Sequence, residues 1–476
     1  MIESLEFRRL LSASLNNGIL TITGGAAGDV LIAENQGSHI KVIENGSKVS
    51  TFKTTKVNHI VFNGLAGNDT LTNRSSKPSI MNGGSDFDTM IGSPTVGDDF
   101  NGGSESDTVT YASRTQNLLL SIGAGADGAN GGAEGDNIRP DVERVVGGSG
   151  NDVMTGSANA DVLEGGPGND EMHGLGGDDN LIGSIGNDLL DGGDDSDNMD
   201  GGAGDDRYFE TQRFLPTVDT MTDSGGIDTL DFSGSFTKLD IDMALDAGQV
   251  QDLNGDASAR LFGVFENAIG GPFSTQLRGN EANNILDNRF ATFDSTVDGR
   301  GGNDWLIGSP ETDDNMFGGG GDDLLDGVSS ERDGGDFIDG GTGFDTLDLS
   351  HRSNDLEIST DSDAANQQDD GELNESDEVR GVEHVICGSG NDEVLLGDDA
   401  DKTANYWFEG RGGRDTLANV TGLFVAGTGN CTLQGGEGND PLLFGGDGDG
   451  DRRGDRHSRQ RGGDLPLDRL LPGPNP

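Results

Sequence analysis

The sequence is poor in basic residues and has no long apolar run. Its 476 residues include 30 Lys and Arg against 86 Asp and Glu, which gives a formal net charge of −56. Because proteins hold nucleic-acid backbones through Lys and Arg, this balance argues against a nucleic-acid partner. It also argues against binding to an anionic membrane surface. No apolar run approaches the roughly 18 residues that a spanning helix needs, so we expect no membrane span.

Cysteine and aromatic residues are also scarce. The two cysteines, Cys387 and Cys431, are too few for a disulfide framework and form either one bridge or two thiols. Aromatic residues make up 5% of the chain, whereas glycine contributes 82 residues. A charged, glycine-rich composition of this kind is typical of disordered chains, because it offers little apolar surface to bury. A folded structure therefore requires a regular placement of the few apolar residues.

Recognisable catalytic motifs are missing from the sequence. Neither the HExxH motif of zinc proteases nor the GxSxG motif of esterases occurs. The six histidines are scattered without metal-ligand spacing, and we interpret them as surface or loop residues. No segment completes an EF-hand calcium loop. We therefore expect the chain to have no enzymatic activity of its own.

The most regular feature that the sequence does contain is a nine-residue period over residues 147–209. This stretch divides into seven units: GGSGNDVMT, GSANADVLE, GGPGNDEMH, GLGGDDNLI, GSIGNDLLD, GGDDSDNMD and GGAGDDRYF. Each unit begins with Gly, has Asp at its sixth place and has a large apolar residue at its eighth. A disordered chain has no reason to keep this phase, and a short fixed period predicts stacked repeats.

Each unit is typical of a turn followed by a short strand. Glycine permits the positive φ angles of a tight turn, and alternation in the strand points the eighth residue inward. Two units form an 18-residue coil, so the sixth-place Asp residues form two columns with about 4.8 Å between neighbouring coils. One column holds Asp152, Asp170, Asp188 and Asp206, and the other holds Asp161, Asp179 and Asp197.

These columns create an electrostatic problem. Two carboxylates about 4.8 Å apart repel by roughly 3.5 kcal/mol at an effective dielectric constant of 20. A divalent cation between successive turns would turn this repulsion into attraction. Carboxylate and carbonyl oxygens are hard ligands that suit calcium, and flexible coordination favours calcium over magnesium. The neighbours within the two columns predict roughly five calcium sites in this block.

The units resemble the hemolysin-type calcium-binding (RTX) nonapeptide GGxGxDxUx, most clearly at residues 165–172. The resemblance implies an all-β fold, a right-handed parallel β-roll or β-helix solenoid, in which sixth-place Asp residues and turn carbonyls bind several Ca²⁺ ions. The implied ligands are Asp69, Asp152, Asp161, Asp170, Asp179, Asp188, Asp197, Asp206, Asp304, Asp323, Asp345, Asp392, Asp415 and Asp440, with the turn glycines Gly148, Gly150, Gly166, Gly168 and Gly177.

Several turns depart from the pattern. Asn159 and Asp195 replace the fourth-place Gly, and Ser157, Leu175 and Ser184 replace the second-place Gly. We expect calcium sites that touch these turns to be weaker. The unit at residues 279–287 has Asn in place of the sixth-place Asp, and its site should be poor. A proline at position 441 should weaken the last short strand.

The N-terminal residues differ from the repeats. Residues 5–13 (LEFRRLLSA) resemble the LEPR-XLL motif of large, repetitive, exported bacterial proteins, with Phe7 in place of the motif's proline. We interpret residues 1–17 as a leader or sorting motif. Apolar alternation predicts strands at 19–23, 29–33, 39–43 and 59–62, with a hairpin turn at Asn45-Gly46. These strands would form a β-rich cap over residues 18–63 that closes the exposed end of the solenoid.

A longer repetition interrupts the nonapeptides three times. Each interruption begins after an Asp-Thr pair and ends at a Glu, at residues 107 and 143, 228 and 266, and 345 and 383. Each insert has a central apolar stretch, at 118–122, 239–243 and 356–358. This pattern predicts longer β coils that continue the same stack. The alternative is that the acidic loops of the inserts form a ligand-binding surface.

The predicted organisation follows from these features. The order is a leader at 1–17, a cap at 18–63, first repeats at 64–110, an insert at 111–146, the main repeat block at 147–209, a second insert at 210–278, a second block at 279–348, a third insert at 349–386, a third block at 387–450 and an Arg/Pro-rich tail at 451–476. The tail is interpreted either as a disordered basic segment or as the product of a reading-frame slip.

We interpret the chain as a calcium-binding bacterial repeat protein, secreted or displayed on the cell surface, whose β-roll folds on calcium. Weak binding at many sites suits the extracellular medium, where calcium is millimolar. Two alternatives stay open. One is an adhesin or extracellular matrix protein with an unknown cell-surface partner, and the other is the calcium-binding tail of a truncated exported enzyme or toxin.

Overall fold

The structure is a computed structural model that describes most of residues 12–444. The residues outside the description in this range are 124–126, 129–133, 211–216, 236–237, 245–249, 253–256, 274, 311, 328–335, 360–370, 373–377, 396–405, 412–414, 421, 426–431 and 436–441. Much of the predicted leader and all of the predicted tail therefore lie outside it. Among the described residues, the helical structure is a single 3-10 turn, η1 (Thr54–Lys56), and no helix is long and apolar enough to cross a membrane.

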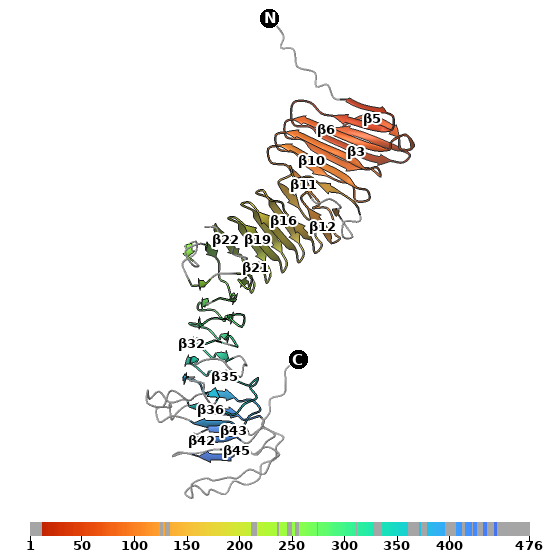
Figure 1. Ribbon diagram of the computed structural model, residues 1–476. Coiled ribbons are helices and arrows are strands. Elements are labelled where there is room, and N and C mark those ends of the chain that lie inside the picture. Colours follow the sequence, from red (N-terminus) through yellow and green to blue (C-terminus); the bar gives the residue numbers. More distant parts are fainter. Residues whose placement is uncertain are drawn as a thin grey trace.

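The chain is an elongated stack of parallel strands (Figure 1), as the repeat pattern predicts. Sheet 1 contains β1 (Ser12–Asn16), β2 (Ile19–Thr23), β6 (His59–Ala66), β8 (Ser79–Ser85), β10 (Asp98–Ser104) and β13 (Asn137–Ile138). Sheet 2 contains β25 (Val250–Asp252), β26 (Ala257–Phe262), β22 (Thr217–Asp223), β20 (Asn198–Ala203), β18 (Asn180–Ile185), β16 (Val162–Pro167), β14 (Arg144–Val146), β11 (Thr108–Thr110), β9 (Thr89–Ile91), β7 (Thr70–Arg74), β3 (Val30–Gln36), β4 (His39–Glu44) and β5 (Ser47–Lys53).

Three further sheets complete the stack. Sheet 3 contains β12 (Leu118–Ser121), β15 (Val153–Thr155), β17 (Glu171–Gly176), β19 (Leu189–Asp194), β21 (Arg207–Phe209), β23 (Thr229–Asp231), β27 (Asn267–Ile269), β29 (Ile285–Asp287), β31 (Trp305–Ile307), β33 (Leu324–Asp326), β35 (Thr346–Asp348), β39 (His384–Ile386), β41 (Tyr406–Glu409), β43 (Gly422–Val425) and β45 (Leu442–Phe444). Sheet 4 contains β24 (Leu239–Asp242), β28 (Thr275–Arg278), β30 (Ser295–Asp298), β32 (Asp314–Gly320), β34 (Phe337–Thr342) and β38 (Glu378–Arg380), and sheet 5 contains β37 (Gly371–Glu372), β36 (Leu356–Ser359), β40 (Glu393–Leu395), β42 (Thr416–Val420) and β44 (Thr432–Gly435).

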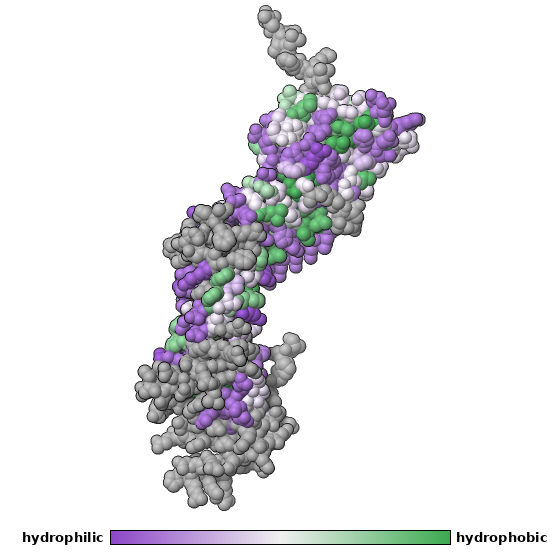
Figure 2. All heavy atoms as spheres, in the orientation of Figure 1, coloured by the Kyte–Doolittle hydropathy of each residue, from purple (hydrophilic) through white to green (hydrophobic). Residues whose placement is uncertain are grey.

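The register in the main block follows the predicted 18-residue coil. Met172 lies opposite Met154 and Leu190 in sheet 3, and Leu181 lies opposite Leu163 in sheet 2. The eighth-place side chains are almost fully buried between the two sheets, whereas those at the seventh and ninth places face outward. The core is therefore one narrow file of apolar residues, and the outer face is mainly hydrophilic with scattered apolar patches (Figure 2).

Antiparallel pairing is concentrated at the N-terminal end. Strands β1 and β2 form a hairpin at the edge of sheet 1, and β3, β4 and β5 form a meander at the edge of sheet 2. The turn between β4 and β5 has positive φ at Asn45 and Gly46, as a hairpin turn of this type requires. Strand β1 lies inside the segment that the sequence indicates as a leader.

Each insert exchanges one sheet of the roll for another. At the first insert, sheet 1 ends at β13 and sheet 3 begins at β12, while sheet 2 continues. At the second, sheet 2 ends at β26 and its hairpin partner β25, and sheet 4 begins at β24. At the third, sheet 4 ends at β38 and sheet 5 begins with β36. The central apolar stretches of the inserts thus start new sheets. One sheet runs through each insert without a break, so the insert coils continue the same stack.

Candidate metal centre

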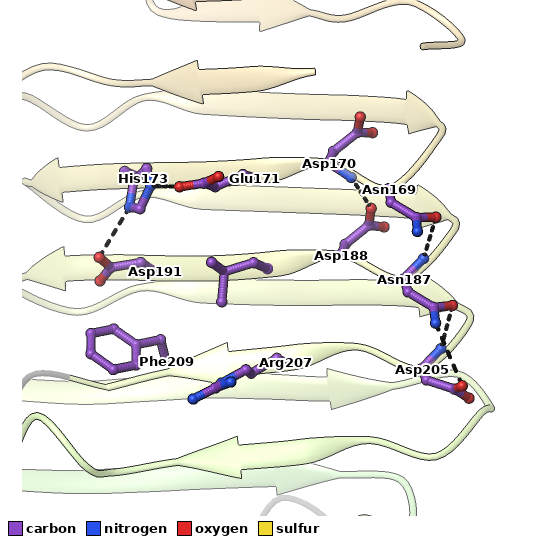
Figure 3. Close-up of a pocket in the computed structure, with 11 residues that line it drawn as sticks. Asn169, Asp170, Glu171, His173, Asn187, Asp188, Asp191, Asp205, Arg207 and Phe209 are labelled. Carbon is purple, nitrogen blue, oxygen red and sulfur yellow. Dashed lines mark hydrogen bonds and ion pairs between the residues drawn. The ribbon is translucent and has the colours of Figure 1, made fainter. Parts of the chain in front are cut away.

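A ladder of hydrogen bonds links the sixth-place Asp residues along each column. The backbone N–H of Asp170 donates to Oδ1 of Asp188 in the next coil at 2.7 Å, and that of Asp179 donates to Oδ1 of Asp197 at 2.8 Å. The same contact joins Asp152 to Asp170 at 2.7 Å. Each carboxylate therefore uses one oxygen to hold the coil before it, which fixes its position in the column (Figure 3).

The ladder divides into four long runs of stacked turns. They are Asp29, Asp69, Asp88, Asp107 and Glu143; Asp152, Asp170, Asp188, Asp206, Asp228 and Glu266; Asp161, Asp179, Asp197 and Asp219; and Asn284, Asp304, Asp323, Asp345 and Glu383. A further pair joins Asp392 to Asp415 at 3.1 Å. The column that contains Asp206 thus continues past the end of the nonapeptide block, to Asp228.

The first turn of each long run differs from the turns above it. We call this first turn a closed turn, because its sixth-place side chain accepts a hydrogen bond from the second-place N–H of its own unit. Gly148 N–H donates to Oδ2 of Asp152 at 2.7 Å, and Ser157 N–H donates to Oδ2 of Asp161 at 2.6 Å. The first turns of the other two runs are closed in the same way, at Asp29 and at Asn284.

In the later, open turns the second- and fourth-place residues take positive φ instead. Within residues 165–209 the pairs are Gly166 and Gly168, Leu175 and Gly177, Ser184 and Gly186, Gly193 and Asp195, and Gly202 and Gly204. The departures at Leu175, Ser184 and Asp195 therefore keep the open conformation, at φ of 81°, 87° and 81°. Ser157 belongs to a closed turn.

Close stacking explains why glycine dominates the open turns. A Cβ on Gly166 would lie 2.4 Å from the carbonyl oxygen of Gly148, and one on Gly168 would lie 2.0 Å from that of Gly150. Both distances are far below van der Waals contact, and the opposing atoms belong to the backbone. The turns of successive coils are therefore pressed together with their carbonyl groups at the contact.

The open turns leave one carboxylate oxygen without a hydrogen bond. Within the described residues, the buried Oδ2 atoms that accept none belong to Asp88, Asp107, Asp170, Asp179, Asp188, Asp228, Asp304, Asp323, Asp345, Asp392 and Asp415. Leaving a buried charged acceptor unsatisfied is strongly unfavourable. Such a row of oxygens calls for a positive partner between the coils.

The same environment raises the pKa values of these carboxyl groups. Burial, reinforced by the charges of neighbouring Asp residues, raises the pKa of Asp179 to about 8 and that of Asp188 to about 7, against hydrogen bonds from the backbone that lower them. The pKa of Asp170 is raised to about 6 for the same reasons. Without a cation, the ionised form of the column is destabilised.

A second ladder runs beside the first at the fifth place. Asn187 N–H donates to Oδ1 of Asn169 at 3.0 Å, and Asp205 N–H donates to Oδ1 of Asn187 at 3.0 Å. These bonds point from the later coil to the earlier one, opposite to those of the Asp ladder (Figure 3). The fifth-place residues are exposed, so this ladder links the solvent-facing edges of successive turns. The recurrent Asn before the sixth-place Asp is the signal that could have indicated it.

The structure places most of the predicted ligands together. Each of the predicted Asp residues except Asp440 is buried at the sixth place of a stacked turn, and the five predicted glycines lie in such turns. Asp440 lies outside the described residues. Asp88, Asp107 and Asp228 occupy equivalent positions that the predicted set omits, although the motif GGSDFDTMI and the Asp-Thr pairs already point to them.

The donor set fits calcium through a mixture of side chain and backbone. Within the described residues, no three side chains of His, Cys, Asp or Glu come together as a metal-binding group. An ion between two coils would therefore take one carboxylate from each coil and complete its shell with turn carbonyls. Calcium accepts six to eight oxygen ligands of these kinds in flexible geometry. Unsatisfied buried Oδ2 atoms beside packed carbonyls match that requirement.

The outer face beside the open turns forms a shallow groove of about 640 Å³ (Figure 3). His173 lies there between Asp191, 3.1 Å from its Nδ1, and Glu171, 3.0 Å from its Nε2. The bond to Asp191 is the main cause that raises the pKa of His173 to about 9. Because the two carboxylates contact opposite sides of the ring, this group is an ion-paired surface histidine.

Comparison with known proteins agrees with the geometry. The family model of the RTX calcium-binding nonapeptide repeat matches four copies, at residues 140–172, 173–208 and 332–349. These stretches make up less than a fifth of the chain and include the open turns of the main block. No curated protein matches the sequence.

Proposed function

Because the chain contains RTX calcium-binding nonapeptide repeats, we propose that it binds a series of calcium ions along its Asp columns and that these ions drive folding of the roll. The observation that carries the proposal is the row of buried Oδ2 atoms that accept no hydrogen bond. Each ion would supply the positive charge that these oxygens lack.

The open-turn Asp residues are the proposed side-chain ligands. In the main block these are Asp170, Asp179, Asp188, Asp197 and Asp206, and elsewhere they are Asp69, Asp304, Asp323 and Asp345. The predicted ligands Asp392, Asp415 and Asp440 would extend the set. Asp152 and Asp161 would contribute from closed turns, where Oδ2 already accepts a hydrogen bond and, in Asp152, Oδ1 accepts one from Leu118 N–H as well. The carbonyls of the turn glycines, Gly148, Gly150, Gly166, Gly168 and Gly177 among them, would complete the shells.

Calcium would then act as a folding ligand. An ion that binds only the folded chain stabilises it by about 2.7 kcal/mol when free calcium is 100 times the dissociation constant. Several such sites in one block together match the stability of a typical domain, which is about 5–15 kcal/mol.

We also propose that the protein is exported or displayed on a bacterial cell surface and has no catalytic activity. Extracellular calcium modules bind with millimolar to submillimolar affinity, which matches the medium outside the cell. The strong negative charge fits a chain that stays extended until calcium neutralises it. RTX repeats are typical of exported bacterial proteins.

An adhesin or matrix protein is the second candidate. The observation that favours it is a row of aromatic rings at the outer face of sheet 3 and the turn before β35. The ring centre of His384 lies 5.1 Å from that of Trp407 and 6.4 Å from that of Phe344 in this turn. If this row binds glycans, then Trp407→Ala should abolish retention on a glycan array while leaving the calcium dependence of folding intact.

Circular dichroism during a calcium titration tests the main proposal. We expect β structure to appear as calcium rises to millimolar concentration and to disappear when a chelator is added. Magnesium at the same concentration serves as the control and should give a much smaller change. A chain that keeps its full β signal in chelator at neutral pH would contradict the proposal.

A further inference from the structure

Three of the four long runs end on a glutamate at the position where the next Asp would stand. Asp107 N–H donates to Oε2 of Glu143 at 2.8 Å. The same bond joins Asp228 to Glu266 at 2.9 Å, and Asp345 to Glu383 at 3.0 Å. The three glutamates come from different inserts, so the contact is a repeated feature of the fold.

A shorter turn accounts for the change from Asp to Glu. Phe100 pairs with Ile138, yet Asp107 lies seven residues after Phe100 whereas Glu143 lies five residues after Ile138. The other two inserts also shorten the turn. Met221 pairs with Leu261, and the spacing falls from seven residues before Asp228 to five before Glu266. Ile338 pairs with Val379, and the spacing falls from seven residues before Asp345 to four before Glu383. In each of these shorter turns the longer side chain of Glu places its Oε2 atom at the column, where it accepts the Asp N–H.

The last Asp of each of these runs still has an unsatisfied oxygen. Asp107, Asp228 and Asp345 are 0%, 1% and 0% exposed, and their Oδ2 atoms accept no hydrogen bond. Elsewhere in each run, an Asp with such an oxygen is followed by another Asp in the next coil. Here the only carboxylate that the ladder places above them is the glutamate.

A hydrogen-bond acceptor alone would not need to be charged. A glutamine would accept the same N–H without bringing a second negative charge next to a buried carboxylate. Asp107 is fully buried, its Oδ2 accepts no hydrogen bond, and its backbone N–H contacts the carboxylate of Glu143. The glutamates therefore aggravate the electrostatic problem unless a cation lies between them and the Asp.

We propose that Glu143, Glu266 and Glu383 are calcium ligands, so that each of these runs ends with an ion held between an Asp and a Glu. The pairs are Asp107 with Glu143, Asp228 with Glu266, and Asp345 with Glu383. This inference rests on the proposed function, and it adds one ion at each insert to those held between Asp residues. In the run from Asp152, each Asp with an unsatisfied Oδ2 then has one carboxylate next to it in the following coil of the ladder.

The test replaces each glutamate by glutamine in the full chain. Glu143→Gln, Glu266→Gln and Glu383→Gln keep an oxygen that can accept the Asp N–H but remove the charge. Bound calcium is counted by equilibrium dialysis at the free concentration that just saturates the parent chain. We expect each variant to bind one ion fewer and the triple variant three fewer. Glu393→Gln, at an exposed outward-facing position of β40, is the matched control and should bind the parent number.

The possible outcomes separate the two proposals. If the parent chain binds no calcium, the proposed function fails. If the parent binds calcium and the triple variant binds as many ions, only the glutamate proposal is overturned. Should the triple variant not reach the parent's β signal in excess calcium, Asp107→Asn is compared with the double variant Asp107→Asn/Glu143→Gln. Loss of the same single ion in both supports a shared site, and loss of a second ion contradicts it.

Discussion

The first two units of the main block and the five that follow share a motif but not a conformation. GGSGNDVMT at 147–155 and GGPGNDEMH at 165–173 have the same residue at six of nine places. In the first, Asp152 accepts a hydrogen bond from Gly148. In the second, Gly166 and Gly168 have positive φ, and Oδ2 of Asp170 accepts no hydrogen bond.

The difference comes from what lies beneath each turn. Unit 147–155 stacks on the first insert, where Ser149 N–H donates to the carbonyl of Arg114 and Asn151 N–H donates to Oδ1 of Asn117. Unit 165–173 stacks on another nonapeptide turn, whose carbonyls press against its glycines. A calcium-type turn therefore needs a turn below it, and the nonapeptide alone does not specify the open conformation.

The largest expected effect is that calcium reverses the sign of the pH dependence of folding stability. The pKa values of the open-turn carboxyls Asp170, Asp179 and Asp188 are raised from 3.8 to about 6, 8 and 7 in the folded chain. Folding without calcium therefore takes up protons, and the stabilisation from this uptake is complete below about pH 4 and is lost as the pH rises through 6 to 8.

In chelator the chain should have little β structure at pH 8. We expect a melting transition to appear as the pH falls towards 5, and its temperature to rise by about 10 °C over this range. In excess calcium the carboxylates are held ionised, so the same acidification should lower it. Calorimetry at both conditions measures the two slopes. Parallel slopes with and without calcium would show that the open columns are not where calcium binds.

Single substitutions in one column should separate open from closed turns. Asp179→Asn removes the unsatisfied charged oxygen of an open turn, and we expect the calcium midpoint of folding to rise at least tenfold, or about 1.4 kcal/mol. Asp161→Asn, in the closed turn one coil earlier, should move the midpoint less than about twofold. It should leave the free energy of unfolding in excess calcium within about 0.5 kcal/mol of the parent value, because Asn keeps an oxygen that can accept the Ser157 N–H, as Asn284 does in another closed turn. Urea titrations followed by circular dichroism measure both quantities, and equal midpoint shifts would refute the distinction.

Replacing second-place serines by glycine should have smaller effects on the free energy of unfolding, with opposite signs in open and closed turns. Ser184 has a φ of 87° in an open turn, a conformation that disfavours residues with a Cβ. Ser184→Gly should therefore raise the free energy of unfolding by about 1 kcal/mol. Ser157→Gly, in a closed turn, should lower it by about 0.5–1 kcal/mol. Thermal unfolding in excess calcium compares them, and a change of the same sign in both would count against two turn conformations.

The smallest effect should be the same in both kinds of turn. Asn187→Ala removes the acceptor for Asp205 N–H in an open turn, and Asn151→Ala removes the acceptor for Asn169 N–H at the closed turn. Each should cost about 0.5–1 kcal/mol, because one exposed hydrogen bond is lost. Neither should change the calcium midpoint by more than about twofold. A large midpoint shift in Asn187→Ala alone would place the fifth-place ladder inside the metal shell.

The repeat period sufficed to predict the strands, the 18-residue register and the two Asp columns. These features depend on alternation and spacing within one unit, which the residues encode locally. Leu181 and Met172, for example, are buried where the eighth-place rule puts them. The predicted calcium ligation by individual Asp residues stays a prediction, and its support is the set of unsatisfied oxygens.

Whether a given turn is open or closed could not be predicted from the sequence in the same way. Asp152 and Asp170 both follow a Gly-Asn pair, and the difference between their turns depends on a coil that lies 18 residues or more away. The glutamates were visible as a spacing of 36 to 38 residues, but their contact with the Asp N–H requires the shortened turn. The sheet exchange was hidden for the same reason, because it depends on which edge an insert strand meets.

The sheet exchange has a consequence for cohesion. Across the second insert, β23 pairs directly with β27, so residues 229–231 hydrogen-bond to residues 267–269 although a long segment of chain separates them. The two parts of the rod are thus joined twice, once by the covalent chain and once by an uninterrupted face of backbone hydrogen bonds. A cut in the peptide chain inside the insert would remove the first connection and leave the second. The two fragments would therefore stay associated as one particle.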